Sequence, residues 1–264
     1  MPAGLKMRSL ATKSGLTSGL LIGLLIHGVA AHAANPNALW QIVHGRCVPN
    51  ERQHGDPRPC VEVDLRPGVG RGFAVLKDRN GATQFLLIPT KRISGIESRS
   101  VRTPDAVNYF AAAWRARGLV ANILGHAMAR DRLSLAVNSM FGRTQNQLHI
   151  HIDCLRADVR EALHRRRFAI GRRWRPLDEL LAGHRYRAMR VTGRSLAGHN
   201  PFSLLARRVP GAGMDMGRHT LVVVGMRFPG QTPGFVILDH RADPARGDDA
   251  SGEELQDHAC ALGH

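Results

Sequence analysis

The fold is indicated first by residues 142–153, Gly142-Arg143-Thr144-Gln145-Asn146-Gln147-Leu148-His149-Ile150-His151-Ile152-Asp153. From position 147 onward, polar and apolar residues alternate with a period of two, which is typical of a β-strand. Side chains at alternate positions of a strand point to the same face. We therefore expect the apolar set to enter the core (Leu148, Ile150, Ile152) and the polar set to line the opposite face (Gln147, His149, His151, Asp153).

The segments around this stretch predict an α+β fold in which helices flank an antiparallel sheet. Strands are expected at 72–78, 84–90, 133–138, near Tyr186, and in an apolar hairpin formed by 219–228 and 235–240. The first two strands are joined by Asp78-Arg79-Asn80-Gly81, a strong hairpin signal. Helices are expected at 38–48, at 104–124, at 158–168 with Asp158 as its cap, near Leu204, and at 253–262. The Pro- and Gly-rich segment 49–59 is expected to be a loop.

The N-terminus has the composition of an export segment. Three basic residues, Lys6, Arg8 and Lys13, precede an apolar run over 16–31, and Ala31-His32-Ala33 resembles a signal-peptidase site. The run is shorter than the roughly 20 residues that a membrane-spanning helix needs. We expect residues 1–34 to be a signal peptide or a membrane anchor, with the anchor favoured, and residues 35–264 to form one domain.

Export bears on whether the cysteines form disulfides. An even count of four is typical of disulfide bonding in an oxidising compartment. Three pairings are open. Cys47 with Cys60 would close the loop between them, and Cys154 with Cys260 would tie the C-terminus to the middle of the chain. Four buried thiols are the alternative, and the absence of a C-x-x-C spacing disfavours a zinc site.

Composition limits the classes of function. The formal charge of +16 comes almost entirely from Arg distributed along the chain, so it permits an anionic partner without identifying one. Aromatic residues make up only 5% of the sequence, and no Arg run is interleaved with them, so no nucleic-acid partner is expected. The chain has enough apolar residues to bury a core.

The alternating histidines resemble the histidine-triad motif, in which three histidines occupy alternate positions of a strand. The resemblance to bacterial CDP-diacylglycerol diphosphatases, members of that superfamily, covers nearly the whole chain after residue 38. It rests on the segment 138–151 and on shorter matches in order: Pro89-Thr90, Arg92-Ile93, Gly95, Glu97-Ser98, Asp158-Val159-Arg160-Glu161, Arg173-Trp174, Pro176-Leu177 and Gln256-Asp257-His258. The cysteines and the N-terminal segment also fit that layout.

The resemblance implies a fold similar to that of the histidine-triad proteins and a role for each residue of the motif. His149 would attack the phosphorus of the CMP group, with His151 as the third histidine and Gln147 at the first position, where the family has His. Consecutive side chains on this face lie about 6.5–7 Å apart, so two imidazoles can act on one phosphate. The residues implied to bind phosphate are Thr144, Asn138, Arg143 and Asn146. The other histidines, His184 and His240 among them, are expected to be structural or exposed.

The predicted reaction is hydrolysis of CDP-diacylglycerol to CMP and phosphatidate through a nucleotidyl-histidine intermediate. It needs no metal and no cofactor, since a neutral imidazole is a competent nucleophile. The predicted location is the inner membrane, with the catalytic domain facing the periplasm and an anionic membrane surface as partner. Three alternatives stay open: a hydrolase or transferase acting on another nucleotide, a non-catalytic module that binds anionic lipid, and a zinc hydrolase whose third ligand is Asp153.

Overall fold

The computed structural model describes Met1 and residues 35–261. The predicted signal peptide or membrane anchor at 1–34 therefore lies outside the described residues, except for Met1. Within the described part, no helix is both long and apolar enough to cross a membrane.

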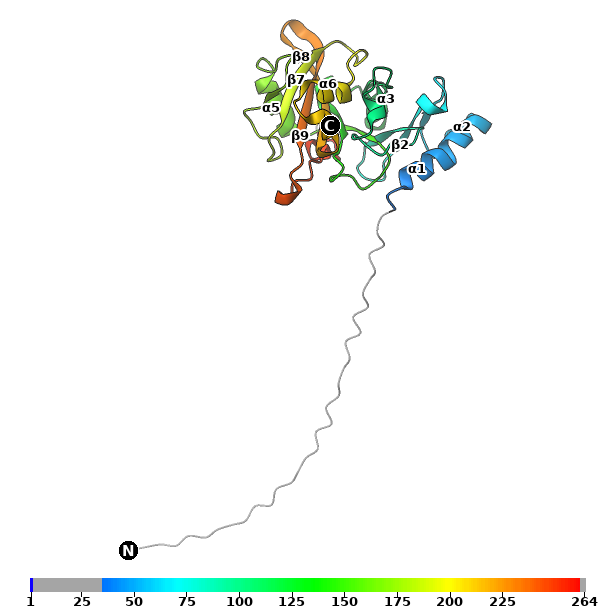
Figure 1. Cartoon of the computed structure of the whole chain (residues 1–264), viewed down its shortest axis with the longest axis horizontal. Helices are drawn as coiled ribbons and strands as arrows, with labels where there is room; N and C mark the ends of the chain where they lie inside the picture. The colour runs from blue at the N-terminus through cyan, green and yellow to red at the C-terminus, as the bar shows by residue number, and fades with distance from the viewer. Residues whose placement is uncertain (2–34, 262–264) are drawn as a thin grey trace. The chain divides into compact units, whose positions relative to one another are not determined.

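Ten strands of residues 35–261 form one sheet, and all of its pairings are antiparallel (Figure 1). The strands are β1 (Glu62–Asp64), β2 (Phe73–Lys77), β3 (Phe85–Pro89), β4 (Leu133–Val137), β5 (Ile150–Leu155), β6 (Arg175–Pro176), β7 (Arg187–Thr192), β8 (His219–Phe228), β9 (Thr232–Arg241) and β10 (Gln256–Asp257). Their order is β1-β2-β3-β5-β4-β8-β9-β7-β6, and β10 also pairs with β5. The α+β class with an antiparallel sheet is confirmed.

Helices cover both faces of this sheet. They are α1 (Ala38–Ile42), α2 (Val48–His54), α3 (Tyr109–Ala116), α4 (Gly118–Leu124), α5 (Ala157–Arg166) and α6 (Pro201–Arg208). Helices α3, α4 and α6 bury Phe110, Val120 and Phe202 in the core on one face. On the other face, α1 and α2 pack on β2 and β3, and α5 contributes Val159 and Leu163 to a separate cluster.

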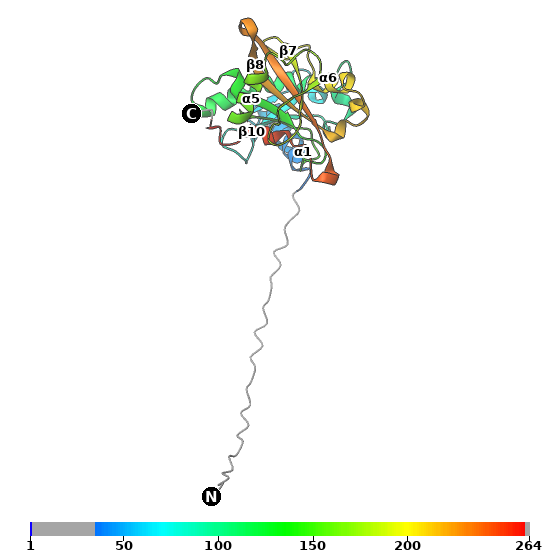
Figure 2. The same ribbon diagram turned by 90° about the vertical axis from the view of Figure 1, so that its left-hand side faces the viewer.

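The two predicted hairpins are confirmed. Strands β2 and β3 pair through the loop that contains Asp78 and Gly81. Strands β8 and β9 form the longest pairing, from His219 opposite Arg241 to Phe228 opposite Thr232 (Figure 2, orange). Val222 and Val224 face one core and Leu221 and Val223 face the other, because successive side chains of a strand alternate between faces.

The first helical region is longer than predicted. A π-helical turn, η1 (Val43–Cys47), joins α1 to α2, so helix continues to His54 where we predicted a loop from residue 49. Pro49 does not end the helix, and it lies directly after the π-helical turn, at the start of α2. Gly55 ends the helix with a φ of 62°.

Two other predicted helices are corrected. The helix expected over 104–124 begins at Tyr109, after Asn108 caps it by accepting a hydrogen bond from the N–H of Ala111, and it breaks at Arg117. Asp158 is not the cap of α5, because it lies in the first turn, where its negative charge favours the helix N-terminus.

The predicted helix at 253–262 is wrong. The chain forms the short 3-10 helix η9 (Gly252–Leu255) and then β10, which pairs with Leu155 and Cys154 of β5. The disulfide between Cys154 and Cys260 holds this end of the chain against β5. A second disulfide joins Cys47 to Cys60, so this pairing, one of the three left open, is the one formed.

Candidate active site

The quoted stretch places its two histidines at the start of β5. Leu148, Ile150 and Ile152 are fully buried in the core, as predicted. The strand begins at Ile150, however, and not at residue 147. Residues 147–149 run instead beside the segment that follows β3, where the N–H of Leu148 donates to the carbonyl of Ile93 at 2.6 Å.

The opposite face of this strand is also buried. His149 is 8% exposed and His151 is 4% exposed, because α1 and η9 approach that face of the sheet. The two rings meet edge to face with centroids 4.7 Å apart. They line a pocket of about 530 Å³ together with residues of α1, the β2–β3 loop, the β4–β5 loop and η9.

The proton of His149 is located by its hydrogen bond. Its Nδ1 atom lies 2.7 Å from the carbonyl oxygen of Gln147. Because a carbonyl only accepts, Nδ1 carries the hydrogen and Nε2 keeps its lone pair. Burial lowers the pKa of His149, with the hydrogen bond to Gln147 opposing part of that shift. A neutral imidazole with a free Nε2 is the form that acts as a nucleophile.

His151 lies against two residues that no sequence motif indicated. Its Nδ1 atom lies 2.7 Å from Nε2 of Gln84 and 3.0 Å from Oε1 of Glu253. The amide hydrogens of Gln84 serve both Nδ1 and Glu253 in this arrangement, which puts the hydrogen of His151 on Nε2. That buried Nε2 has no partner within residues 35–261, and burial lowers the pKa of His151 well below its ordinary value. It is a neutral donor suited to a phosphate oxygen.

Glu253 connects the residues around His151 by hydrogen bonds. Its Oε2 atom accepts a 2.6 Å hydrogen bond from Nδ2 of Asn138, and its own N–H donates to Oδ1 of Asn138 at 3.4 Å. The carboxylate thus links the predicted phosphate-binding residue Asn138 to His151. No local pattern indicated Glu253, since it lies 115 residues from Asn138 and in a segment predicted to be helical.

The predicted residues fall into two groups. His149, His151, Asn138 and Thr144 line the same pocket. Thr144 is exposed, and its hydroxyl has no partner among the described residues. The other three lie outside the lining: Gln147, Arg143 and Asn146.

Gln147 acts on the main chain. Its Nε2 atom donates to the carbonyls of Pro89 and Lys91, both at 3.0 Å, and its Oε1 accepts from the N–H of Ile93 at 3.3 Å. The side chain is fully buried, so at the first triad position it fixes the segment that follows β3, and its carbonyl orients His149.

Arg143 and Asn146 have other surroundings. The guanidinium of Arg143 forms a bidentate ion pair with Glu97, at 2.6 and 2.8 Å. Asn146 is exposed, and its N–H donates to the carbonyl of Pro36 at 2.7 Å, beside the start of α1. Their roles in phosphate binding stay predictions.

Cations near the pocket come from positions that we did not single out. Arg46, Lys77 and Arg79 line it, and no acidic side chain among the described residues pairs with them. The hairpin signal predicted the turn that carries Arg79 but not its position at the pocket. Apolar side chains make up another part of the lining: Leu39, Ile42, Pro59, Leu76 and Leu86.

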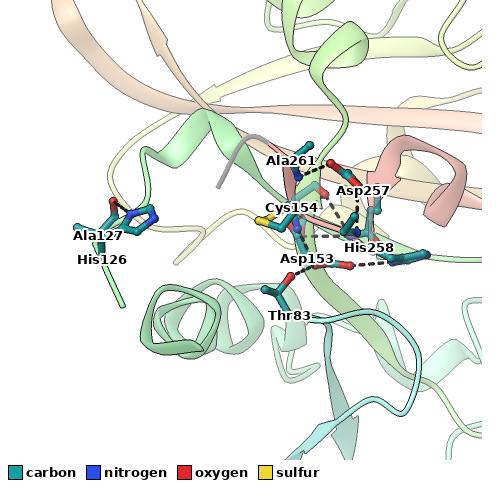
Figure 3. Close-up of a disulfide and its surroundings, with 12 residues drawn as sticks. Thr83, His126, Ala127, Asp153, Cys154, Asp257, His258 and Ala261 are labelled. Atoms are coloured by element: carbon teal, nitrogen blue, oxygen red, sulfur yellow. Dashed lines mark hydrogen bonds and ion pairs between the residues drawn. A yellow bond between two sulfur atoms is a disulfide. The ribbon is translucent and has the colours of Figure 1, made fainter. Parts of the chain in front are cut away.

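Asp153 and His258 form a separate pair behind the pocket. Asp153 is fully buried, accepts from the hydroxyl of Thr83 at 2.7 Å, and lies 2.8 Å from Nδ1 of His258 (Figure 3). The hydrogen bond to Asp153 raises the pKa of His258. Both oxygens of Asp153 are therefore engaged away from His149, which leaves the zinc alternative without its expected third ligand.

Comparison with known proteins places the chain in a class of enzymes that cleave phosphoanhydrides. The profile described as CDP-diacylglycerol pyrophosphatase matches residues 34–264. A CDP-diacylglycerol pyrophosphatase from Yersinia pestis is 42% identical over 257 residues, covering 97% of this chain and 96% of that protein. The chain belongs to the CDP-diacylglycerol pyrophosphatase family.

Proposed function

We propose that the protein hydrolyses CDP-diacylglycerol to CMP and phosphatidate, with His149 as the nucleophile. Membership of the family supports the reaction. The observation that supports the nucleophile is the hydrogen bond from Nδ1 of His149 to the carbonyl of Gln147, which leaves Nε2 unprotonated.

The reaction takes two displacements. In the first, the lone pair of Nε2 attacks the phosphorus of the CMP group, and the bond from that phosphorus to the bridging oxygen breaks. Phosphatidate leaves as an acidic phosphate, whose second pKa is about 6, so it needs no full proton transfer. The imidazole becomes cationic while it is bound to CMP, and the carbonyl of Gln147 stabilises this charge through the Nδ1 hydrogen.

In the second displacement, water attacks the same phosphorus, and the P–N bond breaks. The electron pair returns to Nε2 of His149, CMP leaves, and solvent takes the proton of the water. Throughout, the Nε2 hydrogen of His151 is directed at a non-bridging oxygen, since Gln84 and Glu253 fix the orientation of its ring. Asn138 and Thr144 are the remaining polar groups at the phosphate.

The lining of the pocket suits both parts of the substrate. The cations Arg46, Lys77 and Arg79 fit the diphosphate, and apolar side chains such as Leu39 and Leu76 fit the start of the lipid. This match favours CDP-diacylglycerol over a small soluble nucleotide, which would leave those apolar side chains exposed to water.

The disulfides support the proposed location. Both cysteine pairs are bonded, and such bonds persist in oxidising compartments. We propose that residues 35–264 form a single domain similar to that of the histidine-triad proteins. It faces the periplasm at the inner membrane, and residues 1–34 act as its signal peptide or anchor. The excess of Arg suits an anionic membrane surface.

The test is release of CMP from CDP-diacylglycerol micelles by wild type and by His149→Ala, each with and without EDTA. We expect release that survives a brief EDTA treatment and falls at least 1,000-fold in the variant, the order of loss when an essential nucleophile is removed. Immediate loss in EDTA would favour the zinc alternative, and equal activity of the variant would reject His149.

A further inference from the structure

A second cluster of histidines and carboxylates lies outside the pocket, at the other end of η9. His184 precedes β7, His240 is near the end of β9, and Asp248 follows in the C-terminal segment. One ligand atom from each of the three lies within 4.8 Å of the other two. Nε2 of His240 is 2.7 Å from Oδ2 of Asp248, and the rings of His184 and His240 stack with centroids 5.1 Å apart.

The hydrogen bonds of His240 create a conflict that a cation resolves. Its Nδ1 atom lies 2.9 Å from the carbonyl oxygen of Arg185, so Nδ1 carries a hydrogen. In the neutral ring, Nε2 is then a lone pair that faces the acceptor-only carboxylate of Asp248. A second proton or a metal ion between the two atoms would make this 2.7 Å contact attractive.

The surroundings of His184 match those of a metal ligand. Its Nδ1 atom lies 2.8 and 2.9 Å from the two carboxylate oxygens of Glu254, which also accepts a 2.6 Å hydrogen bond from the hydroxyl of Tyr186. Histidines that bind metals commonly use one nitrogen for the ion and give the other to a carboxylate or a main-chain carbonyl. In His184 the second nitrogen faces the carboxylate of Glu254, and in His240 it faces the main-chain carbonyl of Arg185.

The charges in the cluster favour a divalent ion over protons. Asp248 and Glu254 bring two negative charges, and within residues 35–261 no Arg or Lys side chain forms an ion pair with either carboxylate, while Arg156 donates to the main-chain carbonyl of Glu254 at 3.2 Å. Protonation would balance these charges only by placing two imidazolium rings in a stack, where they repel each other. The side chain of His184 is 36% exposed and that of Asp248 is 19% exposed, so an ion has a path from solvent.

We propose that His184, His240 and Asp248 bind a divalent transition-metal ion, for which zinc is the best match. Two imidazoles and one carboxylate are a common zinc ligand set, and a water molecule completes the tetrahedron. Glu254 then orients His184 from behind. With Zn–N distances of about 2.0–2.1 Å, neighbouring ligand atoms lie roughly 3.3 Å apart. Binding therefore widens the contact between His240 and Asp248 and draws His184 inward.

The ion would also act on the active site. Glu254 and Glu253 are consecutive residues of η9, so an ion that fixes Glu254 also fixes the turn that carries Glu253 to His151. This role is structural and does not enter the chemistry at His149. The inference therefore stands whether or not His149 is the nucleophile.

The experiment measures zinc bound per chain in tag-free protein, by equilibrium dialysis and elemental analysis after chelator treatment. We expect one zinc ion per chain for wild type, for His149→Ala and for the control His54→Ala, which removes an exposed histidine at the end of α2. His240→Ala and Asp248→Ala should abolish stoichiometric binding. Glu254→Gln should weaken it about 10- to 100-fold, as changes behind a metal ligand do.

Two results would overturn the proposal. Wild type that binds no zinc at micromolar concentration would show that protons alone hold the cluster. Zinc that disappears in His149→Ala but remains in His240→Ala and Asp248→Ala would place the ion in the active-site pocket. Circular dichroism of each variant checks its folding, and the paired changes at 240 and 248 keep the test decisive if one of them fails to fold.

Discussion

Replacing Glu253 by Gln tests the network that orients His151. Two donors point at this carboxylate, Nδ2 of Asn138 at 2.6 Å and Nε2 of Gln84 at 3.1 Å, and the same Gln84 amide donates to Nδ1 of His151, which lies 3.0 Å from the carboxylate. A Gln side chain has one acceptor and one donor group, so it keeps the bonds on one side only. On the other side its NH2 meets an amide that also donates.

The expected loss follows from the energy of one charged hydrogen bond, about 1.5–3 kcal/mol. Since about 1.4 kcal/mol corresponds to a factor of ten, kcat/KM should fall by about 10- to 150-fold. The charge of Glu253 raises the pKa of His149, so its removal should also move the acidic limb of the pH profile to lower pH. A side chain that only fills space would not produce this second change.

The assay is CMP release across a pH series, with Glu161→Gln as the control. The side chain of Glu161 is 68% exposed and lies on α5, so its replacement should leave both the rate and the profile unchanged. Glu253→Gln with the kcat/KM and the pH profile of wild type would refute the role given to this residue.

Three further predictions follow from the geometry. Protonation removes the lone pair of His149, and burial lowers the pKa of this residue below its ordinary value of 6.5. We therefore expect kcat/KM to stay constant from neutral pH down to 6.5 and to decline only below it, and a decline centred above 6.5 would contradict this. Gln147→Ala should lower the free energy of unfolding in urea by about 1–3 kcal/mol, since it leaves the buried carbonyl of Pro89 and the buried N–H of Ile93 without this partner, and an unchanged midpoint would argue against that role. Replacing Cys154 and Cys260 by Ser should cost on the order of 4 kcal/mol in guanidinium unfolding, because the bond closes a loop of 106 residues, and a loss below about 1 kcal/mol would contradict the estimate.

Local patterns in the sequence predicted the sheet well. The apolar alternation around Val222 and Ile237 and the turn residues at Asp78 and Gly81 depend on neighbours along the chain, so they predict hairpins without knowledge of the rest of the fold. The alternation around the histidines likewise predicted the strand and the face to which each of its side chains points.

Long-range contacts explain what the sequence did not predict. Residues 253–262 have helical spacing, yet Gln256 and Asp257 pair with β5, and Nε2 of Gln256 donates to Oγ of Ser134 at 3.1 Å. Glu253 and Gln84 are 169 positions apart in the sequence, so no local pattern could predict their contact. The role of Gln147 was missed for the same reason, since its partners follow β3.

The proposed mechanism requires that CMP becomes attached to His149 during turnover. The direct measurement is rapid acid-free quenching of the enzyme with CDP-diacylglycerol labelled in the cytidine, followed by mass spectrometry of the peptide that spans β5. We predict a CMP adduct on His149 that forms and decays at the rate of turnover and is absent from His149→Ala. Turnover without labelled protein at any time, together with inversion of configuration at the attacked phosphorus, would contradict the account.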